Sequence, residues 1–150
     1  MKEKIVGKGN IFSTGIKWTA DAENDRLEQP SKREAWMTDK IVVLVTAGSL
    51  QESKKIARRL VESRLAACVN VTPPVQSIYR WQGKVAEDRE FLLIIKTSRK
   101  RFAEVKSAVL KIHSYTTPEI ISLPILDGSN EYLAWLDDSV RPSRGARGRA

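Results

Sequence analysis

The sequence holds one cysteine, Cys68, and one histidine, His113, in 150 residues. A single cysteine excludes an intrachain disulfide and any zinc site built from several thiolates. Cys68 and His113 are also the only possible thiol–imidazole pair, and Cys68 lies inside an apolar segment rather than at an activating helix N-terminus. Walker A, GxGxxG and HExxH motifs are missing as well. We therefore predict that the protein is not an enzyme.

Long hydrophobic runs are also missing. A transmembrane helix needs roughly 18–20 consecutive apolar residues, whereas the run from Ile41 to Val45 has only the length of a strand. The stretch from Met1 to Asn10 is mostly charged or small and has no apolar signal-peptide segment. These features predict a cytoplasmic protein with no membrane partner.

The net charge of +8 is unevenly distributed along the chain. Half of it lies in residues 141–150, which carry four arginines and no acid. Because this Gly/Arg/Ser stretch lacks apolar residues that could fold it, we expect a disordered tail, with weak attraction to RNA or membranes as the alternative. Residues 37–140 carry fifteen basic and twelve acidic side chains. With a net charge of only +3, the folded part is not expected to form a basic nucleic-acid-binding surface, and we expect no specific nucleic-acid partner.

The chain divides into three zones. Residues 1–38 show no sustained periodicity and are expected to be a poorly ordered extension, 39–140 form the domain, and 141–150 form the tail. Within the domain we expect strands at 41–45, 67–79 (interrupted by Pro73 and Pro74), 84–97 and 120–125, and helices at 49–64, 99–113 and from Ser129. Ser49 and Glu52 have the spacing of a capping box at the start of the first helix.

The order of these elements is β-α-β-β-α-β followed by a terminal helix. That order predicts an α+β fold with a ferredoxin-like antiparallel sheet that carries helices on one face. The hairpin arms around the turn Trp81-Gln82-Gly83 span about 13 residues each, whereas a usual strand has about 5–6. Such long apolar arms favour pairing with another subunit, so we expect an oligomer.

Several short motifs appear in a fixed order, and together they resemble the CutA family of divalent-ion tolerance proteins. The resemblance covers about 100 residues and rests on these segments: 64–70 (RLAACVN), Ser77-x-Tyr79-x-Trp81-x-Gly83, Glu90 with Lys96-Thr97, His113-x-Tyr115-x-x-Pro118-Glu119, Pro124 and Tyr132-Leu133-x-Trp135-Leu136. It implies a homotrimer that is similar in architecture to the PII signalling proteins, and a link to the tolerance of divalent metals, copper especially.

Two residues are the first candidates for metal ligands. Cys68 offers a soft thiolate suited to copper(I), with a small buried hydrophobe as the alternative role. His113 offers an imidazole, with stabilisation of a helix C-terminus as the alternative. One thiolate binds copper weakly, so a site shared between subunits is expected.

A second set of residues could line a cleft between subunits. Glu90 and Lys96 lie six residues apart on one strand and point to the same face, with inter-strand ion pairs as the alternative role. The aromatic residues of this set could instead simply pack in a core or an interface. The set comprises Tyr79, Trp81, Glu90, Lys96, Tyr115 and Glu119.

These expectations define one leading functional hypothesis and one rival. The leading hypothesis is a trimeric cytoplasmic protein that responds to divalent metal ions and binds copper or a similar cation, as a non-obligatory ligand, in clefts between subunits. The rival is a PII-like signalling or scaffold module that binds a small anionic ligand or a protein partner.

Overall fold

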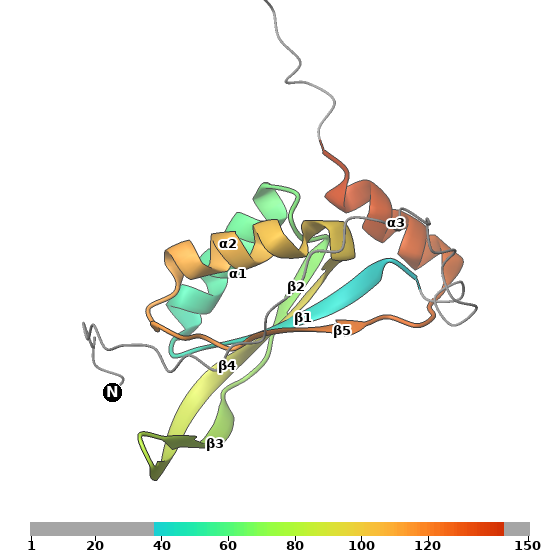
Figure 1. Ribbon diagram of the computed structural model, residues 1–150. Helices are drawn as coiled ribbons and strands as arrows, with labels where there is room; N and C mark the ends of the chain where they lie inside the picture. The colour runs from blue at the N-terminus through green and yellow to red at the C-terminus, as the bar shows by residue number, and fades with distance from the viewer. Residues whose placement is uncertain (1–37, 143–150) are drawn as a thin grey trace, which may run out of the picture. The chain divides into compact units, whose positions relative to one another are not determined.

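A computed structural model describes residues 38–142 of the chain (Figure 1). The predicted N-terminal extension and nearly all of the predicted tail lie outside these described residues. None of the described helices is long and apolar enough to cross a membrane.

The elements follow the predicted order, and the fold is α+β and ferredoxin-like. The proline-interrupted strand is divided into β2 and β3, and the second helix opens with a short 3₁₀ turn, η1. The bounds are β1 Lys40–Ala47, α1 Leu50–Glu62, β2 Cys68–Val71, β3 Val75–Trp81, β4 Lys84–Ser98, η1 Arg99–Arg101, α2 Phe102–Ile112, β5 Ile120–Pro124 and α3 Asn130–Val140.

The sheet is antiparallel, with the strand order β2-β4-β1-β5. The 15-residue strand β4 is long enough to serve two sets of neighbours. Its C-terminal half pairs with β1 and β2, while its N-terminal half pairs only with β3. The β3–β4 hairpin consequently projects beyond the part of the sheet that the helices cover (Figure 1).

The break between β2 and β3 is a bulge opposite β4. Val71 pairs with Leu93 and Val75 pairs with Glu90, so three residues on one strand face two on the other. Two of the three are the prolines of the predicted interruption, which cannot donate ladder hydrogen bonds. At the far end Gln82 and Gly83 both have positive φ, at 48° and 79°, which is the geometry of a two-residue hairpin turn.

The main core lies between the sheet and the two helices α1 and α2, which lie side by side over one face of the sheet (Figure 1). Alternate residues of β1 and β4 point into this layer and meet the apolar stripe of each helix. The fully buried members include Val43, Val45, Ile56, Leu60, Leu93, Ile95, Val105 and Val109.

The opposite face of the sheet, which we call the open face, is apolar and only partly covered. The register puts the intervening residues of β1, β4 and β5 side by side on it. Its apolar members are Val42, Leu44, Leu92, Ile94, Ile121 and Leu123, of which the last two are 49% and 48% exposed.

Helix α3 packs at the end of the sheet where β1 begins. Its residues Leu136 and Val140 are buried with Ala67 in a small second core. Lys40 Nζ lies 2.7 Å from a carboxylate oxygen of Asp137, and Arg101 donates two hydrogen bonds of 3.0 Å to the carbonyl of Val140. These contacts attach α3 to both β1 and η1.

Candidate functional site

Two tyrosines and two carboxylates form a polar cluster at the β3–β4 hairpin. Tyr79 of β3 donates a hydrogen bond to the carboxylate of Asp88 on β4. Tyr115, from the loop after α2, is hydrogen-bonded to the carboxylate of Glu90. We call these four residues the carboxylate–tyrosine cluster. It contains three of the predicted cleft residues, Tyr79, Glu90 and Tyr115.

The hairpin register explains how β3 and β4 contribute to the cluster. The pairs Tyr79–Ala86, Ser77–Asp88 and Val75–Glu90 are directly opposite one another, so alternate residues share one side of the hairpin. Asp88 and Glu90 are two apart on β4 and therefore point the same way. The strand geometry itself brings the two carboxylates together.

Tyr115 reaches this position because the loop after β1 leaves room for its ring. A Cβ atom added at Gly48 would lie 2.8 Å from the Tyr115 hydroxyl oxygen, closer than real Cβ contacts. Glycine at position 48 is therefore required for the observed approach of the phenol.

His113 packs against Tyr115 of the cluster, with ring centroids 4.9 Å apart, and both of its ring nitrogens have hydrogen-bond partners in the same chain. Nδ1 accepts a 3.0 Å hydrogen bond from the Tyr115 backbone N–H, and Nε2 lies 2.7 Å from the Thr46 carbonyl oxygen. An acceptor Nδ1 carries no proton, so this pattern requires the neutral tautomer with its proton on Nε2. To ligate a metal, His113 would have to give up one of these two bonds.

Glu52 joins the first turn of α1 to the loop that carries His113. Its backbone N–H donates a 3.2 Å hydrogen bond to Oγ of Ser49, the N-cap residue, as predicted. Its carboxylate Oε1, however, accepts a 2.5 Å hydrogen bond from the Ser114 N–H. The same oxygen lies 4.0 Å from His113 Nδ1. The Glu52 carboxylate, which we predicted to complete a capping box, thus binds the loop that follows α2.

The pKa values of both cluster tyrosines are raised. The hydrogen bond to Asp88, then burial and the nearby carboxylate charges, raise the pKa of Tyr79 to about 12. Burial, followed by the charge and hydrogen bond of Glu90, raises the pKa of Tyr115. Both hydroxyls therefore remain protonated donors at neutral pH.

Cys68 lies at the other end of the sheet from His113. It is opposite Lys96 on β4, which is in turn opposite Val42 of β1, whereas His113 contacts Thr46 four residues further along β1. Four residues of strand span about 13 Å. The two first metal candidates are therefore not brought together within one protomer.

The surroundings of Cys68 are aromatic. Burial, and secondarily the nearby Cys68 thiolate, raise the pKa of Tyr132 on α3. Tyr132 also packs against Trp135, with ring centroids 5.2 Å apart. The thiol is partly buried at the β2 edge of the sheet.

The remaining predicted cleft residues are not among the four cluster residues. Lys96 is hydrogen-bonded to the side-chain carbonyl of Asn70 on β2, so its described partner is an amide rather than the carboxylate of an ion pair. Trp81 is 44% exposed at the tip end of β3. Glu119 is exposed in the loop before β5.

Sequence reasoning missed Asp88 of the cluster and the hydrogen bond from Ser114 to Glu52. Counting outward from the turn Gln82-Gly83 could have found Asp88, because it pairs Asp88 with Ser77 and therefore puts Asp88 on the same side of the hairpin as Tyr79. The link from Glu52 to Ser114 joins residues 62 positions apart and ends on a backbone N–H, which leaves no side-chain pattern to detect.

Within residues 38–142, no group of three or more His, Cys, Asp or Glu side chains is arranged to hold a metal ion. Divalent cations usually take four or more protein or water ligands. The carboxylate–tyrosine cluster offers two carboxylates, and Cys68 is too far from His113 for both to bind one ion. The described residues of one chain therefore offer too few ligands in one place for a complete metal site.

The chain is similar in sequence to proteins of one family. Residues 41–139 match the family described as CutA1 divalent ion tolerance protein. The divalent-cation tolerance protein CutA of Thermus thermophilus is 52% identical over 99 residues, which cover 66% of this chain and 96% of that protein. A chloroplastic CutA of Arabidopsis thaliana is 44% identical over 116 residues, covering 77% and 62% of the two chains.

Solved structures agree with the sequence matches. The Thermus thermophilus protein superimposes with a TM-score of 0.67 at 50% identity, covering 68% of this chain and 99% of that one. CutA1 from Oryza sativa gives a TM-score of 0.68 at 42% identity, with 71% and 98% covered. A further similar structure, from Archaeoglobus fulgidus, is described as periplasmic. The names of these relatives therefore span more than one compartment.

Proposed function

Because the chain belongs to the CutA1 family of divalent ion tolerance proteins, we propose that it acts as a homotrimer that binds a divalent cation where its subunits meet. The proposed role is binding rather than catalysis, and the proposed location is the cytoplasm. Copper or a similar cation is the proposed ligand, held without being needed for folding.

The observation that carries this proposal is the carboxylate–tyrosine cluster. Asp88 and Glu90 present oxygen atoms, the ligands that hard divalent cations prefer, and their two phenol donors hold them in fixed orientations. The two carboxylates alone are too few for a complete site, so water or a neighbouring subunit must supply the remaining ligands.

The open face supports the proposed trimer. By strand alternation, Asp88 and Glu90 lie on the same side of β4 as Ile94, so the cluster is continuous with an apolar surface. The projecting hairpin also exposes Ile78 and Val85, at 66% and 65%, on the side opposite to the cluster. The contiguous apolar surface of the open face is typical of a subunit interface.

The test is a calorimetric titration of the purified full chain with Cu²⁺ and Zn²⁺, combined with its mass by sedimentation. We expect a mass three times 16.9 kDa. Replacing Asp88→Asn should weaken cation binding by about tenfold or more, because it removes a charged oxygen ligand. Glu87→Gln is the matched control, since Glu87 is exposed on the opposite side of the same strand.

Three results would contradict parts of the proposal. Equal affinities of Asp88→Asn and Glu87→Gln would remove the cluster from the site. Loss of Cu²⁺ binding in Cys68→Ser, with binding retained in Asp88→Asn, would move the site to the thiol. An intact trimer that binds none of these cations would favour the rival signalling module.

A further inference from the structure

The helix layer concentrates positive charge that the average over the chain conceals. Residues 50–64 and 99–112 carry ten Lys or Arg side chains and three Asp or Glu, a net charge of +7. The rest of residues 38–142 carries six basic and nine acidic side chains, a net charge of −3. The near-neutral average of the folded part thus hides two surfaces of opposite sign.

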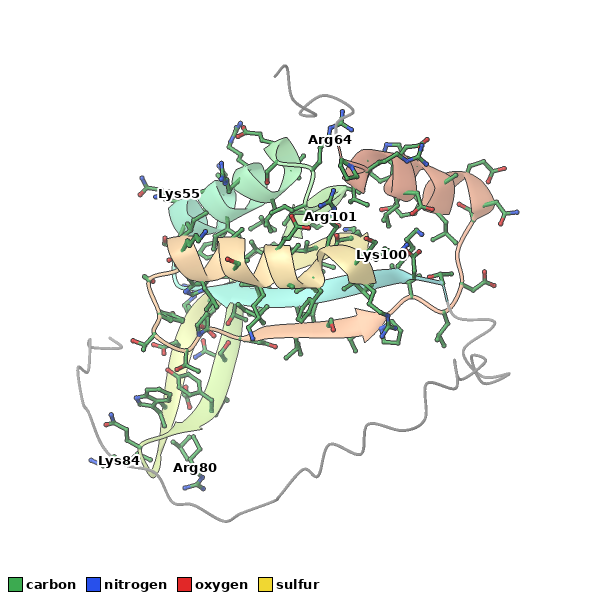
Figure 2. The ribbon with its side chains drawn as sticks, turned by 45° about the horizontal axis from the view of Figure 1, so that its top comes forward. Lys55, Arg64, Arg80, Lys84, Lys100 and Arg101 are labelled. Atoms are coloured by element: carbon green, nitrogen blue, oxygen red, sulfur yellow. The ribbon has the colours of Figure 1, made fainter. Side chains whose placement is uncertain are left out.

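Nearly all of these cations face solvent. Arg101 is half-buried, because its guanidinium binds the Val140 carbonyl and Glu104. Figure 2 shows Lys55, Arg64 and Lys100 on the helix layer, whereas Arg80 and Lys84 lie far away at the hairpin tip. The exposed cations, which form what we call the basic helix face, are Lys54, Lys55, Arg58, Arg59, Arg64, Arg99, Lys100, Lys106 and Lys111.

A groove joins the two halves of the basic helix face. It lies between α1 and α2, has a volume of about 710 Å³, and its charged lining residues are Arg59 of α1 and Lys111 and Glu104 of α2. Glu104 is paired with Arg101, which offsets its charge. Small side chains, Ala103 and Ser107, line it as well. A linear anion lying along this groove would contact cations from both helices.

We propose that the basic helix face binds the phosphate backbone of duplex DNA without reading its sequence. Duplex DNA carries one negative charge per about 1.7 Å of its axis, and a 13-residue helix such as α1 is about 20 Å long. The face is therefore long enough to meet several phosphates at once. This interaction is independent of the proposed cation site, which lies at the hairpin.

The composition of the helices favours a duplex over a single strand. Proteins that bind single strands stack bases on aromatic rings. Phe102 is the sole aromatic residue of α1, η1 and α2, and it is half-buried against the main core. With no exposed ring to stack on, the face can attract phosphates but offers nothing to unpaired bases.

The end of the described chain lies beside the basic helix face. Val140, the last residue of α3, is held by Arg101 at the edge of this face. A second groove there is lined by Lys100, Arg101 and Arg141 together with Asp39, Glu104 and Asp137, so its own charges balance. The sequence beyond Pro142 adds Arg144, Arg147 and Arg149 and no acid. Basic arms of this composition commonly add phosphate contacts beside a folded site.

The experiment measures binding of the full chain to a fluorescent 24-base-pair DNA duplex by anisotropy, between 50 and 200 mM salt. The test variant is Lys55→Glu with Lys100→Glu, and the matched control is Arg80→Glu with Lys84→Glu, which changes the net charge equally. The test pair should weaken binding at 50 mM salt by about tenfold or more and make the salt dependence shallower by about two charges. The control pair should weaken it by less than about threefold.

Further probes decide between the duplex and other anions. Deleting residues 143–150 should weaken binding without abolishing it. The proposal is wrong if the wild-type chain does not bind the duplex, if the two variant pairs weaken binding equally, or if the deletion alone abolishes binding. It is equally wrong if a 24-nucleotide single strand, an RNA duplex or phosphatidylserine vesicles bind about tenfold more tightly than duplex DNA.

Discussion

The two faces of the sheet are built from neighbouring residues of the same strands, yet they have different surroundings. On β1, Val43 and Val45 are fully buried under α1 and α2, while Val42 and Leu44, which alternate with them, are only half-buried on the open face. A strand covered on one side would normally alternate apolar and polar residues. The continuous apolar run of β1 therefore favours a second covering layer, which residues 38–142 of one chain do not supply.

The largest effect is expected on the helix-covered face. Leu93 is fully buried in the main core, so Leu93→Ala should lower the free energy of unfolding by about 2–5 kcal/mol through lost burial and a residual cavity. Urea denaturation followed by circular dichroism measures this change. Because the contacts are within one protomer, the loss should be similar at all protein concentrations.

Ile94 is the matched position, since it follows Leu93 on β4 and points to the open face. In Ile94→Ala, the loss of stability should depend on protein concentration, because the contacts removed belong to the proposed trimer. A loss in Ile94→Ala that is as large as in Leu93→Ala and independent of concentration would mean that the two faces do not differ as described.

The contrast between the faces also shows what the sequence could predict. Periodicity predicted α1 and α2, because packing against the sheet leaves a regular apolar stripe along each helix, and runs of β-forming residues predicted the strands. It could not give the role of His113, whose partners are the Thr46 carbonyl and the Tyr115 N–H. Backbone groups occur at every position and therefore leave no signal in the sequence.

The candidate site was predictable only in part, for a related reason. Tyr79, Glu90 and Tyr115 were proposed from a family resemblance, but their partners depend on the hairpin register and on the space left by Gly48. The basic helix face was hidden because a net charge averages over surfaces that the fold separates. Segregation of charge follows from three-dimensional placement and not from composition.

An intermediate loss of stability is expected from a substitution where α3 covers one end of the sheet. Lys40 alternates with Val42 and Leu44 along β1, but it is 5% exposed, and its Nζ contacts Asp137. Asp137→Asn should lower the free energy of unfolding by about 1–2 kcal/mol, a modest value because Asp137 itself is half-exposed. Thermal unfolding measures the change.

The neighbouring residue supplies the control for this prediction. Asp138 is exposed and pairs only with exposed Arg141, so Asp138→Asn should change stability by less than about 0.5 kcal/mol. Equal effects of the two substitutions would show that α3 does not stabilise Lys40 through Asp137.

The smallest effect concerns the polar end of the open face, where Tyr79 donates to Asp88. The pKa of Tyr79 is raised to about 12, chiefly by this hydrogen bond, whereas an unfolded tyrosine titrates near 10. A group with a raised folded pKa contributes its stabilisation fully below the unfolded value and loses it as pH rises through the folded value. The contribution of Tyr79 should therefore be complete below about pH 10 and decline between about pH 10 and 12.

Absorbance at 295 nm follows the phenolate directly, and Asp88→Asn should move one tyrosine titration toward pH 10, whereas Glu87→Gln should leave it in place. An unmoved titration in Asp88→Asn would show that the hydrogen bond does not set the pKa of Tyr79, and that the carboxylates of this end are held by other contacts.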